Sequence, residues 1–186
     1  GYGTTEWSPV ASMNVPDHRA SEGADPGTRL GTVGKVAPGS EIKVVDPDSR
    51  ADLGLDTEGL LVYRGPNVMV GYLNNDEATA EKIRDGWYDT GDMGVIDEEG
   101  FITITGRMSR FSKIGGEMVP HGKVEDSLQE ASGEAMQVFA VTCIPDEKKG
   151  ERLAVLHTLQ EDAIPGIVDK LSGMGLPNLF IPRQLD

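Results

Sequence analysis

The sequence is short of cysteine and of long hydrophobic runs. Cys143 is the single cysteine among 186 residues, so an internal disulfide is excluded. No segment approaches the roughly 20 consecutive apolar residues of a membrane-spanning helix, and the N-terminus lacks the pattern of a signal peptide. These absences predict a soluble chain in a reducing compartment. The apolar neighbours of Cys143 predict that its side chain is a small buried hydrophobic group rather than a reactive thiol.

Positive charge is also scarce. The chain has 17 Lys and Arg against 31 Asp and Glu, which gives a formal net charge of −14. A surface that binds a nucleic-acid backbone is usually basic, so the composition argues against a nucleic-acid partner and leaves room only for a local nucleotide site. The 24 glycines and 11 prolines follow no fixed period, which indicates one or two loop-rich domains rather than a helical bundle.

Glycine and proline turns separate short apolar segments in the first part of the chain. The pattern predicts strands at residues 31–36, 41–45 and 59–63, and a hairpin over 94–105. A helix is expected over residues 74–83, with Asn75 or Asp76 as its N-cap. This part should therefore form a small antiparallel sheet or barrel.

The pattern changes after Arg107. Val124, Leu128 and Ala131 recur at helical spacing in residues 120–131, and Pro120 suits the first turn of that helix. Further elements are expected as follows: strands at 137–144 and 152–159, a second helix capped by Asp162, and a last strand at 179–181. The sequence thus predicts an α+β fold with a domain boundary near Ser109.

Residues 2–6, Tyr-Gly-Thr-Thr-Glu, form the first cluster that could carry chemistry. They offer an aromatic face for a base, N–H and hydroxyl donors for phosphate, and a carboxylate for Mg²⁺. No lysine follows the glycine, so this is not a phosphate loop of the lysine-containing kind. Taken alone, the cluster is also compatible with an ordinary turn.

A second cluster, residues 86–92, contains Asp89 and Asp92 around Thr-Gly. The two carboxylates could be a general acid and base, but such pairs are defined by geometry that spacing does not supply. A single ionised Asp92 that accepts hydrogen bonds from two ribose hydroxyls is the simpler hypothesis. We expect Asp92 to be a surface carboxylate, whose loss would leave the fold intact.

A third cluster, residues 106–117, gathers three cations in an otherwise acidic chain: Arg107, Arg110 and Lys113. Arginine and lysine can neutralise phosphate, and the adjacent Gly115 and Gly116 allow close approach of another surface. The alternative is a basic patch that balances neighbouring carboxylates.

Together with the glycine-rich segment 59–73, these clusters resemble, in order and spacing, the core motifs of the adenylate-forming (AMP-binding) superfamily. That superfamily includes acyl-CoA synthetases, luciferases and peptide-synthetase adenylation domains. Residues 106–119 are most similar to the synthetase half of the bifunctional acyl-[acyl-carrier-protein] synthetase and 2-acylglycerophosphoethanolamine acyltransferase. The resemblance implies that residues 1–109 are the β-rich end of the large domain and that 110–186 are a small, mobile α/β C-terminal domain.

The resemblance also implies a reaction and its site residues. A carboxylate and ATP would form an acyl-adenylate and pyrophosphate, and a thiol would then take the acyl group. Tyr2 would stack near adenine, Thr5 would contact phosphate and Glu6 would bind Mg²⁺, while Asp92 would hold the ribose hydroxyls and Arg107 the ribose or phosphate. The first step is mainly positioning and charge neutralisation.

The second step would use the other end of the third cluster. The implied hinge falls at Ser109, where many members have Asp or Lys, so the hinge departs from the common pattern. Gly115 and Gly116 would allow the passage of pantetheine, and Lys113 is the one candidate for a catalytic group. The implied partners are ATP, Mg²⁺, a fatty acid, and acyl carrier protein or coenzyme A, in the cytoplasm or at the inner face of its membrane.

Other parts that the resemblance implies are not in the sequence. The superfamily's phosphate loop would lie before Tyr2, and its adenylation lysine would lie after Asp186, because no lysine follows Lys170. We therefore expect a piece of a longer enzyme that does not adenylate by itself. A non-catalytic binding module that retains the fold is the alternative. The widely spaced His18, His121 and His157 are expected to be solvent-exposed or structural rather than metal ligands.

Overall fold

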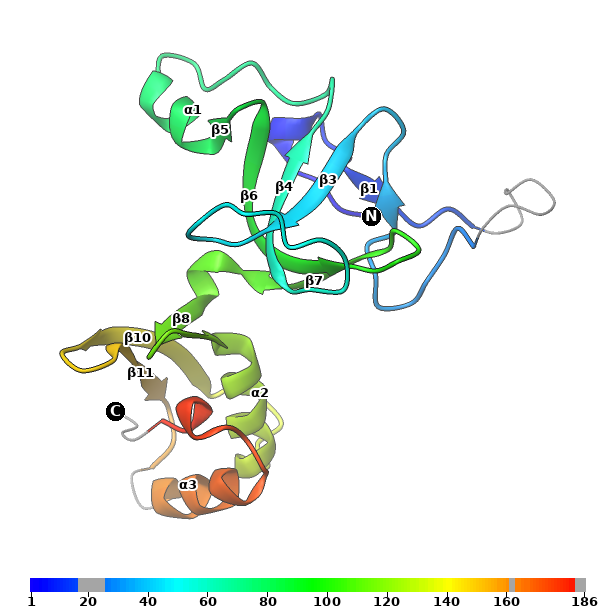
Figure 1. The fold of residues 1–186 in the computed structure, drawn as a ribbon. Coiled ribbons are helices and arrows are strands. Elements are labelled where there is room, and N and C mark those ends of the chain that lie inside the picture. Colours follow the sequence, from blue (N-terminus) through cyan, green and yellow to red (C-terminus); the bar gives the residue numbers. More distant parts are fainter. Residues whose placement is uncertain (17–25, 161–162, 183–186) are drawn as a thin grey trace. The chain divides into compact units, whose positions relative to one another are not determined.

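The computed structural model describes residues 1–16, 26–160 and 163–182 (Figure 1). The chain divides into two compact units, Gly1–Met108 and Ser109–Asp186. Both units combine sheets with helices, so the predicted α+β fold class is confirmed. The assignment of the units to a large domain and a mobile small domain stays a prediction. Within the described ranges, no helix is long and apolar enough to cross a membrane.

The first unit is built on a five-stranded antiparallel sheet in the order β3-β4-β6-β5, with β7 paired to β6. Its strands are β3 (Glu41–Val45), β4 (Gly59–Arg64), β5 (Ile83–Arg84), β6 (Trp87–Ile96) and β7 (Ile102–Arg107). A separate pair consists of β1 (Ser12–Met13) and β2 (Lys35–Val36), so the strand expected over residues 31–36 is confined to its last two residues.

Local signals in this unit are largely confirmed. Helix α1 (Asp76–Lys82) begins after Asn75, whose side-chain oxygen accepts a hydrogen bond from the backbone N–H of Ala78. This bond satisfies one of the free donors of the first turn. The predicted hairpin is formed by β6 and β7.

Buried side chains on one face of the sheet form an apolar core. Two groups of buried side chains form this core: Trp7, Ala11, Tyr63 and Tyr88 in the first, and Val44, Leu61, Ile96 and Ile102 in the second. The first group anchors a short 3₁₀ helix, η1 (Thr5–Trp7), to the sheet. The N-terminal turn is thereby fixed to the strands that follow much later in the sequence.

The second unit packs two helices against a four-stranded antiparallel sheet in the order β10-β11-β8-β9 (Figure 1). Its elements are η3 (Met108–Arg110), β8 (Phe111–Ile114), β9 (Glu117–Pro120), α2 (His121–Ser132), β10 (Phe139–Asp146), β11 (Gly150–His157), α3 (Ile164–Gly173) and η5 (Asn178–Phe180). Val124, Leu128 and Ala131 are all buried as predicted. Pro120 ends β9 and precedes α2, so the helix begins one residue later than expected.

Two expectations for this unit are wrong. Residues 179–181 are not a strand, because the N–H of Phe180 bonds to the carbonyl of Pro177 and closes a 3₁₀ turn. Their apolar side chains pack on the core of the unit without joining the sheet. Cys143 is half-buried rather than buried, since it lies beyond Val141, towards the end of β10, where burial on the strand falls off. The Asp162 cap lies outside the described residues.

His121 occupies the start of α2 with 3% of its surface exposed, and its Nε2 lies 2.6 Å from the Ser112 hydroxyl. Burial and the nearby Arg110 lower the His121 pKa, against a weaker opposing effect of Glu125 and Glu151. The described residues contain no cluster of metal-ligating side chains. His121 is thus buried and hydrogen-bonded within its unit. The expectation that the histidines are not metal ligands stays a prediction, and His18 lies outside the described ranges.

This burial predicts that the second unit loses stability in mild acid. The unfolded chain takes up a proton on His121 near pH 6.5, whereas the folded unit does so only at lower pH. Stability should therefore be full above about pH 7 and fall as the pH drops below 6.5, until the lowered pKa is reached. Urea midpoints of the wild type at pH 7.5 and 5.5 measure the effect. His121→Gln should reduce the pH dependence; an unchanged dependence in this variant would contradict the prediction.

Candidate nucleotide site

The N-terminal turn that holds three of the predicted site residues is rigidly packed. Trp7 is fully buried, and its ring meets Tyr2 edge-on with centroids 5.2 Å apart. Gly3 is required by space, because a Cβ there would lie 1.6 Å from the carbonyl oxygen of Pro9. Tyr2, Thr5 and Glu6 are thus presented from a turn of one defined shape.

The segment 65–73 holds this turn in place. The Asn67 amide donates to the carbonyls of Trp7 and Val10 at 2.6 and 3.0 Å and accepts from the Tyr63 hydroxyl at 2.8 Å. The N–H of Met69 donates to the carbonyl of Glu6 at 2.8 Å. Hydrogen bonds from residues 65–73 therefore hold residues 6–10 in position.

Residues 89–92 form a bulge in β6. Leu60 pairs with Met93 and Val62 with Asp89, so three residues of β4 face five residues of β6. Gly91 has φ of +71°, a conformation that favours glycine. The Thr90 hydroxyl donates to the Leu61 carbonyl at 2.7 Å and accepts from the N–H of Asp92 at 2.9 Å. Bulges of this kind redirect a side chain, and here the redirected side chain is Asp92.

The Asp92 carboxylate is held between two residues from opposite ends of the unit. Its Oδ2 accepts from the Tyr2 hydroxyl at 2.5 Å, and its Oδ1 lies 2.7 Å from Nε of Arg107. Only 3% of Asp92 is exposed. The expectation of a surface carboxylate is therefore wrong, because the bulge turns Asp92 inward. Removal of Asp92 would leave the half-buried Tyr2 hydroxyl without its acceptor.

This arrangement retains capacity to bind a diol. A carboxylate offers about four lone-pair positions, and Tyr2 and Arg107 occupy two of them. The Arg107 side chain is 62% exposed, so it can move aside at little cost. Burial, reinforced by the hydrogen bond to Asp92, raises the pKa of Tyr2, which keeps its hydroxyl a donor at neutral pH.

Glu6 is half-buried and ionised. The Thr4 hydroxyl, a backbone hydrogen bond and the Tyr72 hydroxyl lower its pKa, with Thr4 as the largest influence. Tyr72 donates to Oε1 at 3.0 Å and lies 3.4 Å from the Tyr88 hydroxyl. A lone oriented carboxylate suits Mg²⁺, which usually binds one or two carboxylates together with phosphate oxygens and water.

Among the predicted nucleotide ligands, the structure brings Tyr2, Asp92 and Arg107 into direct contact. Thr5 is exposed at the start of η1, and its carbonyl accepts from the N–H of Ser8 at 3.2 Å. Whether Thr5 contacts phosphate stays a prediction.

The residues predicted for the thiol step lie in the second unit. Ser109 falls in η3, and Lys113 lies on β8. Gly115 and Gly116 form the two-residue turn between β8 and β9, with φ of +61° and +93°. A turn of this type needs positive φ at both positions, so the fold itself requires both glycines. Their predicted part in the passage of pantetheine remains a prediction.

Arg110 has a structural role in the same unit. Its guanidinium lies 2.6 Å from the Glu125 carboxylate and donates to the Val141 carbonyl at 3.0 Å. Arg110 therefore balances the charge of a neighbouring carboxylate, which was the alternative interpretation of the basic cluster.

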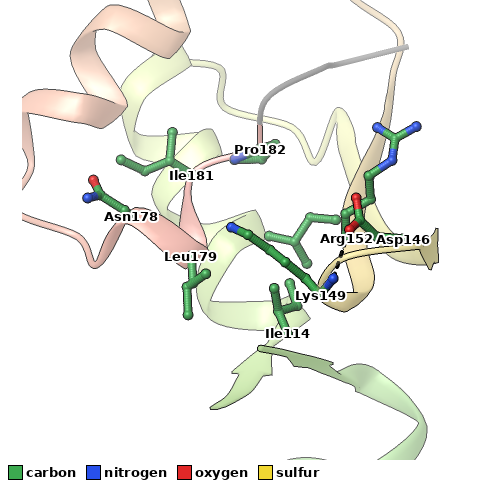
Figure 2. Close-up of a pocket in the computed structure, with 9 residues that line it drawn as sticks. Ile114, Asp146, Lys149, Arg152, Asn178, Leu179, Ile181 and Pro182 are labelled. Atoms are coloured by element: carbon green, nitrogen blue, oxygen red, sulfur yellow. Dashed lines mark hydrogen bonds between the residues drawn. The ribbon is translucent and has the colours of Figure 1, made fainter. Parts of the chain in front are cut away.

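A pocket of about 90 Å³ lies beside the glycine turn (Figure 2). Its lining includes Ile114, Lys149 and Arg152, and the carbonyl of Lys149 accepts from the N–H of Gly115 at 3.0 Å. The backbone N–H groups of Lys148 and Lys149 each donate to the Asp146 carboxylate at 2.9 Å. These two bonds, that of Lys148 first, lower the pKa of Asp146. The volume equals about three water molecules, so the pocket is too small for a substrate.

Sequence reasoning missed Trp7, Asn67 and Tyr72. Trp7 is one of two tryptophans in the chain, and its position directly after the first cluster was the available signal. The contacts of Asn67 with Trp7 and of Tyr72 with Glu6 span 60 and 66 residues, so no local pattern pointed to them.

Known proteins share sequence and fold with this chain. The model of the AMP-binding enzyme family matches residues 1–73. The long-chain-fatty-acid–CoA ligase of Salmonella typhimurium is 33% identical over 164 residues, which cover 88% of this chain and 27% of the relative. The chain is thus similar to AMP-binding enzymes along most of its length. It therefore spans about a quarter of the length of this relative.

Solved structures of superfamily members share the fold. ATP-bound MatB from Rhodopseudomonas palustris has a TM-score of 0.73 at 27% identity, covering 99% of this chain and 35% of that one. The o-succinylbenzoate–CoA synthetase MenE from Bacillus subtilis, in complex with AMP, has a TM-score of 0.71 at 26% identity. It covers 99% of this chain and 36% of the MenE chain.

Proposed function

We propose that this chain supplies the ribose- and metal-binding part of an ATP-dependent acyl-activating ligase. The buried Asp92 carboxylate carries the proposal, because the β6 bulge, Tyr2 and Arg107 together orient it. Similarity to AMP-binding enzymes supports the nucleotide as the ligand of this site. The complete protein would form a fatty acyl-adenylate and transfer the acyl group to a thiol.

In the first step, a carboxylate oxygen of the fatty acid attacks the α-phosphorus of ATP as the bond to pyrophosphate breaks. Asp92 fixes the ribose, and Arg107 is freed from Asp92 to contact the ribose or phosphate. Glu6, held by Tyr72, would bind the Mg²⁺ that neutralises the phosphate oxygens. Thr5, exposed on the same turn, would donate to phosphate.

In the second step, a thiol sulfur attacks the acyl carbon and AMP leaves. The glycine turn of the second unit would approach the thiol-bearing pantetheine, with Ser109 as the hinge and Lys113 beside the path. Coenzyme A is the acceptor that the relatives' names support best. Acyl carrier protein is the alternative acceptor, suggested by the resemblance of residues 106–119. The reaction would take place in the cytoplasm.

Thioester formation by the complete protein tests this function. Fatty acid, ATP and Mg²⁺ are supplied with either coenzyme A or acyl carrier protein, and AMP release is followed. We expect acyl thioester and AMP in equal amounts with one of the two acceptors. Nucleotide binding without turnover would instead support a non-catalytic module, and the absence of both would contradict the proposal.

A further inference from the structure

A second, larger pocket lies on the first unit's sheet, on the face away from Trp7. Residues alternate along a strand, so Leu61 and Tyr63 of β4 enter the core while Val62 points to the other face. Val62 pairs with Lys43 on β3 and Asp89 on β6. These strands enclose a pocket of about 290 Å³.

The pocket has an apolar floor and a cationic rim. Val45 and Val62, both at least 95% buried, form part of the lining. The rim carries Lys43, Arg50 and Arg84, three cations within a chain whose net charge is −14. An apolar floor with a few placed charges is the usual composition of a small-molecule site.

The rim cations differ in how far they are neutralised. Arg50 forms an ion pair with Asp89, and its backbone φ of +62° is a conformation unusual for arginine. Lys43 lies 3.8 Å from the exposed Asp52 carboxylate and 4.5 Å from the ring centre of Trp87. Within the described residues, the Arg84 guanidinium has no ion pair or hydrogen bond.

We infer that this pocket binds a small phosphorylated organic molecule, independently of the nucleotide site at Asp92. The phosphate binds Arg84 and Lys43, and the organic part covers Val45, Val62 and the exposed part of Trp87. Arg50 is held by Asp89 and shapes the wall. Asp85 also lines the pocket. Its negative charge would repel the phosphate, so removal of that charge should strengthen binding.

Trp87 provides the signal for titration of the purified chain. Phenyl phosphate combines the two features of the inferred ligand, inorganic phosphate has only the charge, and benzyl alcohol has only the ring. We expect saturable quenching by phenyl phosphate, at least about fivefold weaker binding of inorganic phosphate, and none of benzyl alcohol. Calorimetry on Trp87→Phe separates loss of signal from loss of binding.

Charge variants locate the ligand. Arg84→Gln and Lys43→Gln should each weaken phenyl phosphate binding about fivefold, the scale of one partly exposed ion pair. Asp85→Asn should strengthen it by a similar factor, because a repulsive charge is removed. Lys148→Gln makes the same charge change as Arg84→Gln outside the pocket and should have no effect. Thermal unfolding of each variant confirms that it is folded.

The outcome also separates this site from the proposed function. Asp92→Asn should leave phenyl phosphate binding unchanged. If Asp92→Asn abolishes the binding while Arg84→Gln retains it, the ligand occupies the nucleotide site and the inference is overturned. Absence of saturable binding, or equal effects of Arg84→Gln and Lys148→Gln, would overturn it as well.

Discussion

Asp92→Asn is expected to raise the ATP concentration required by the complete protein about 100-fold while leaving the fold intact. Hydrogen bonds to a charged group are each worth about 1.5–3 kcal/mol, and two ribose hydroxyls would lose their charged acceptor. Asparagine keeps the size of the side chain, and its carbonyl oxygen can still accept from Tyr2. Its amide nitrogen cannot accept from Arg107, so the ion pair seen at 2.7 Å is lost.

Asparagine is the informative replacement because Asp92 is buried. Alanine would leave the Tyr2 hydroxyl and the Arg107 guanidinium unpaired, and its effect would mix stability with binding. The measurement is KM for ATP in the AMP-release assay, with urea unfolding as the check on folding. Glu98→Gln, an exposed position in the β6–β7 turn, removes the same charge and should change neither. Equal KM values for Asp92→Asn and the wild type would exclude the ribose role.

The sequence predicted Asp92 as a ligand but not the way it is held. The Tyr2 hydroxyl reaches Asp92 across 90 residues, and neither periodicity nor a motif encodes such a contact. The bulge follows from Gly91 and Thr90, whose side-chain bonds become visible only when β4 lies beside β6. The placement of Asp92 on the surface failed for the same reason.

Local patterns were reliable where one element decides its own structure. Asn75 caps α1, and Val124 and Leu128 lie on the buried face of α2. Local patterns failed where tertiary packing determines the structure. Residues 179–181 are apolar because they cover the core of their unit, and they pair with no strand. An apolar run indicates burial, and burial is shared by strands and by turns that close a core.

Arg50 and Arg84 illustrate a further gap between sequence and structure. They lie 34 residues apart in the sequence and belong to no motif, yet both line one pocket. Charge counted along the chain gave an acidic protein with one cluster of cations, at residues 107–113. In the folded sheet, the pairing of β3, β4 and β6 brings Arg50 and Arg84 to the rim of one pocket.

Trp7→Ala is expected to destabilise the first unit by about 3–5 kcal/mol, the usual cost of removing a fully buried large aromatic side chain. That is a large share of the roughly 5–15 kcal/mol that stabilises a typical domain. The Trp7 ring contacts Tyr2, Tyr63 and Tyr88, so its loss opens a cavity directly beneath the turn that carries Tyr2 and Glu6.

Urea unfolding followed by circular dichroism measures this cost. Trp87→Ala is the matched control, because Trp87 is half-buried and its ring is covered by Lys43 and Arg64 instead of the core. Its loss should cost about 1 kcal/mol, the order of an exposed cation–π contact. Similar costs for the two variants would contradict the anchoring role of Trp7. A large cost for Trp7→Ala alone would mean that Trp7 stabilises both the core of the unit and the candidate nucleotide site. The shape of the Tyr2–Glu6 turn would then depend on the burial of the Trp7 side chain.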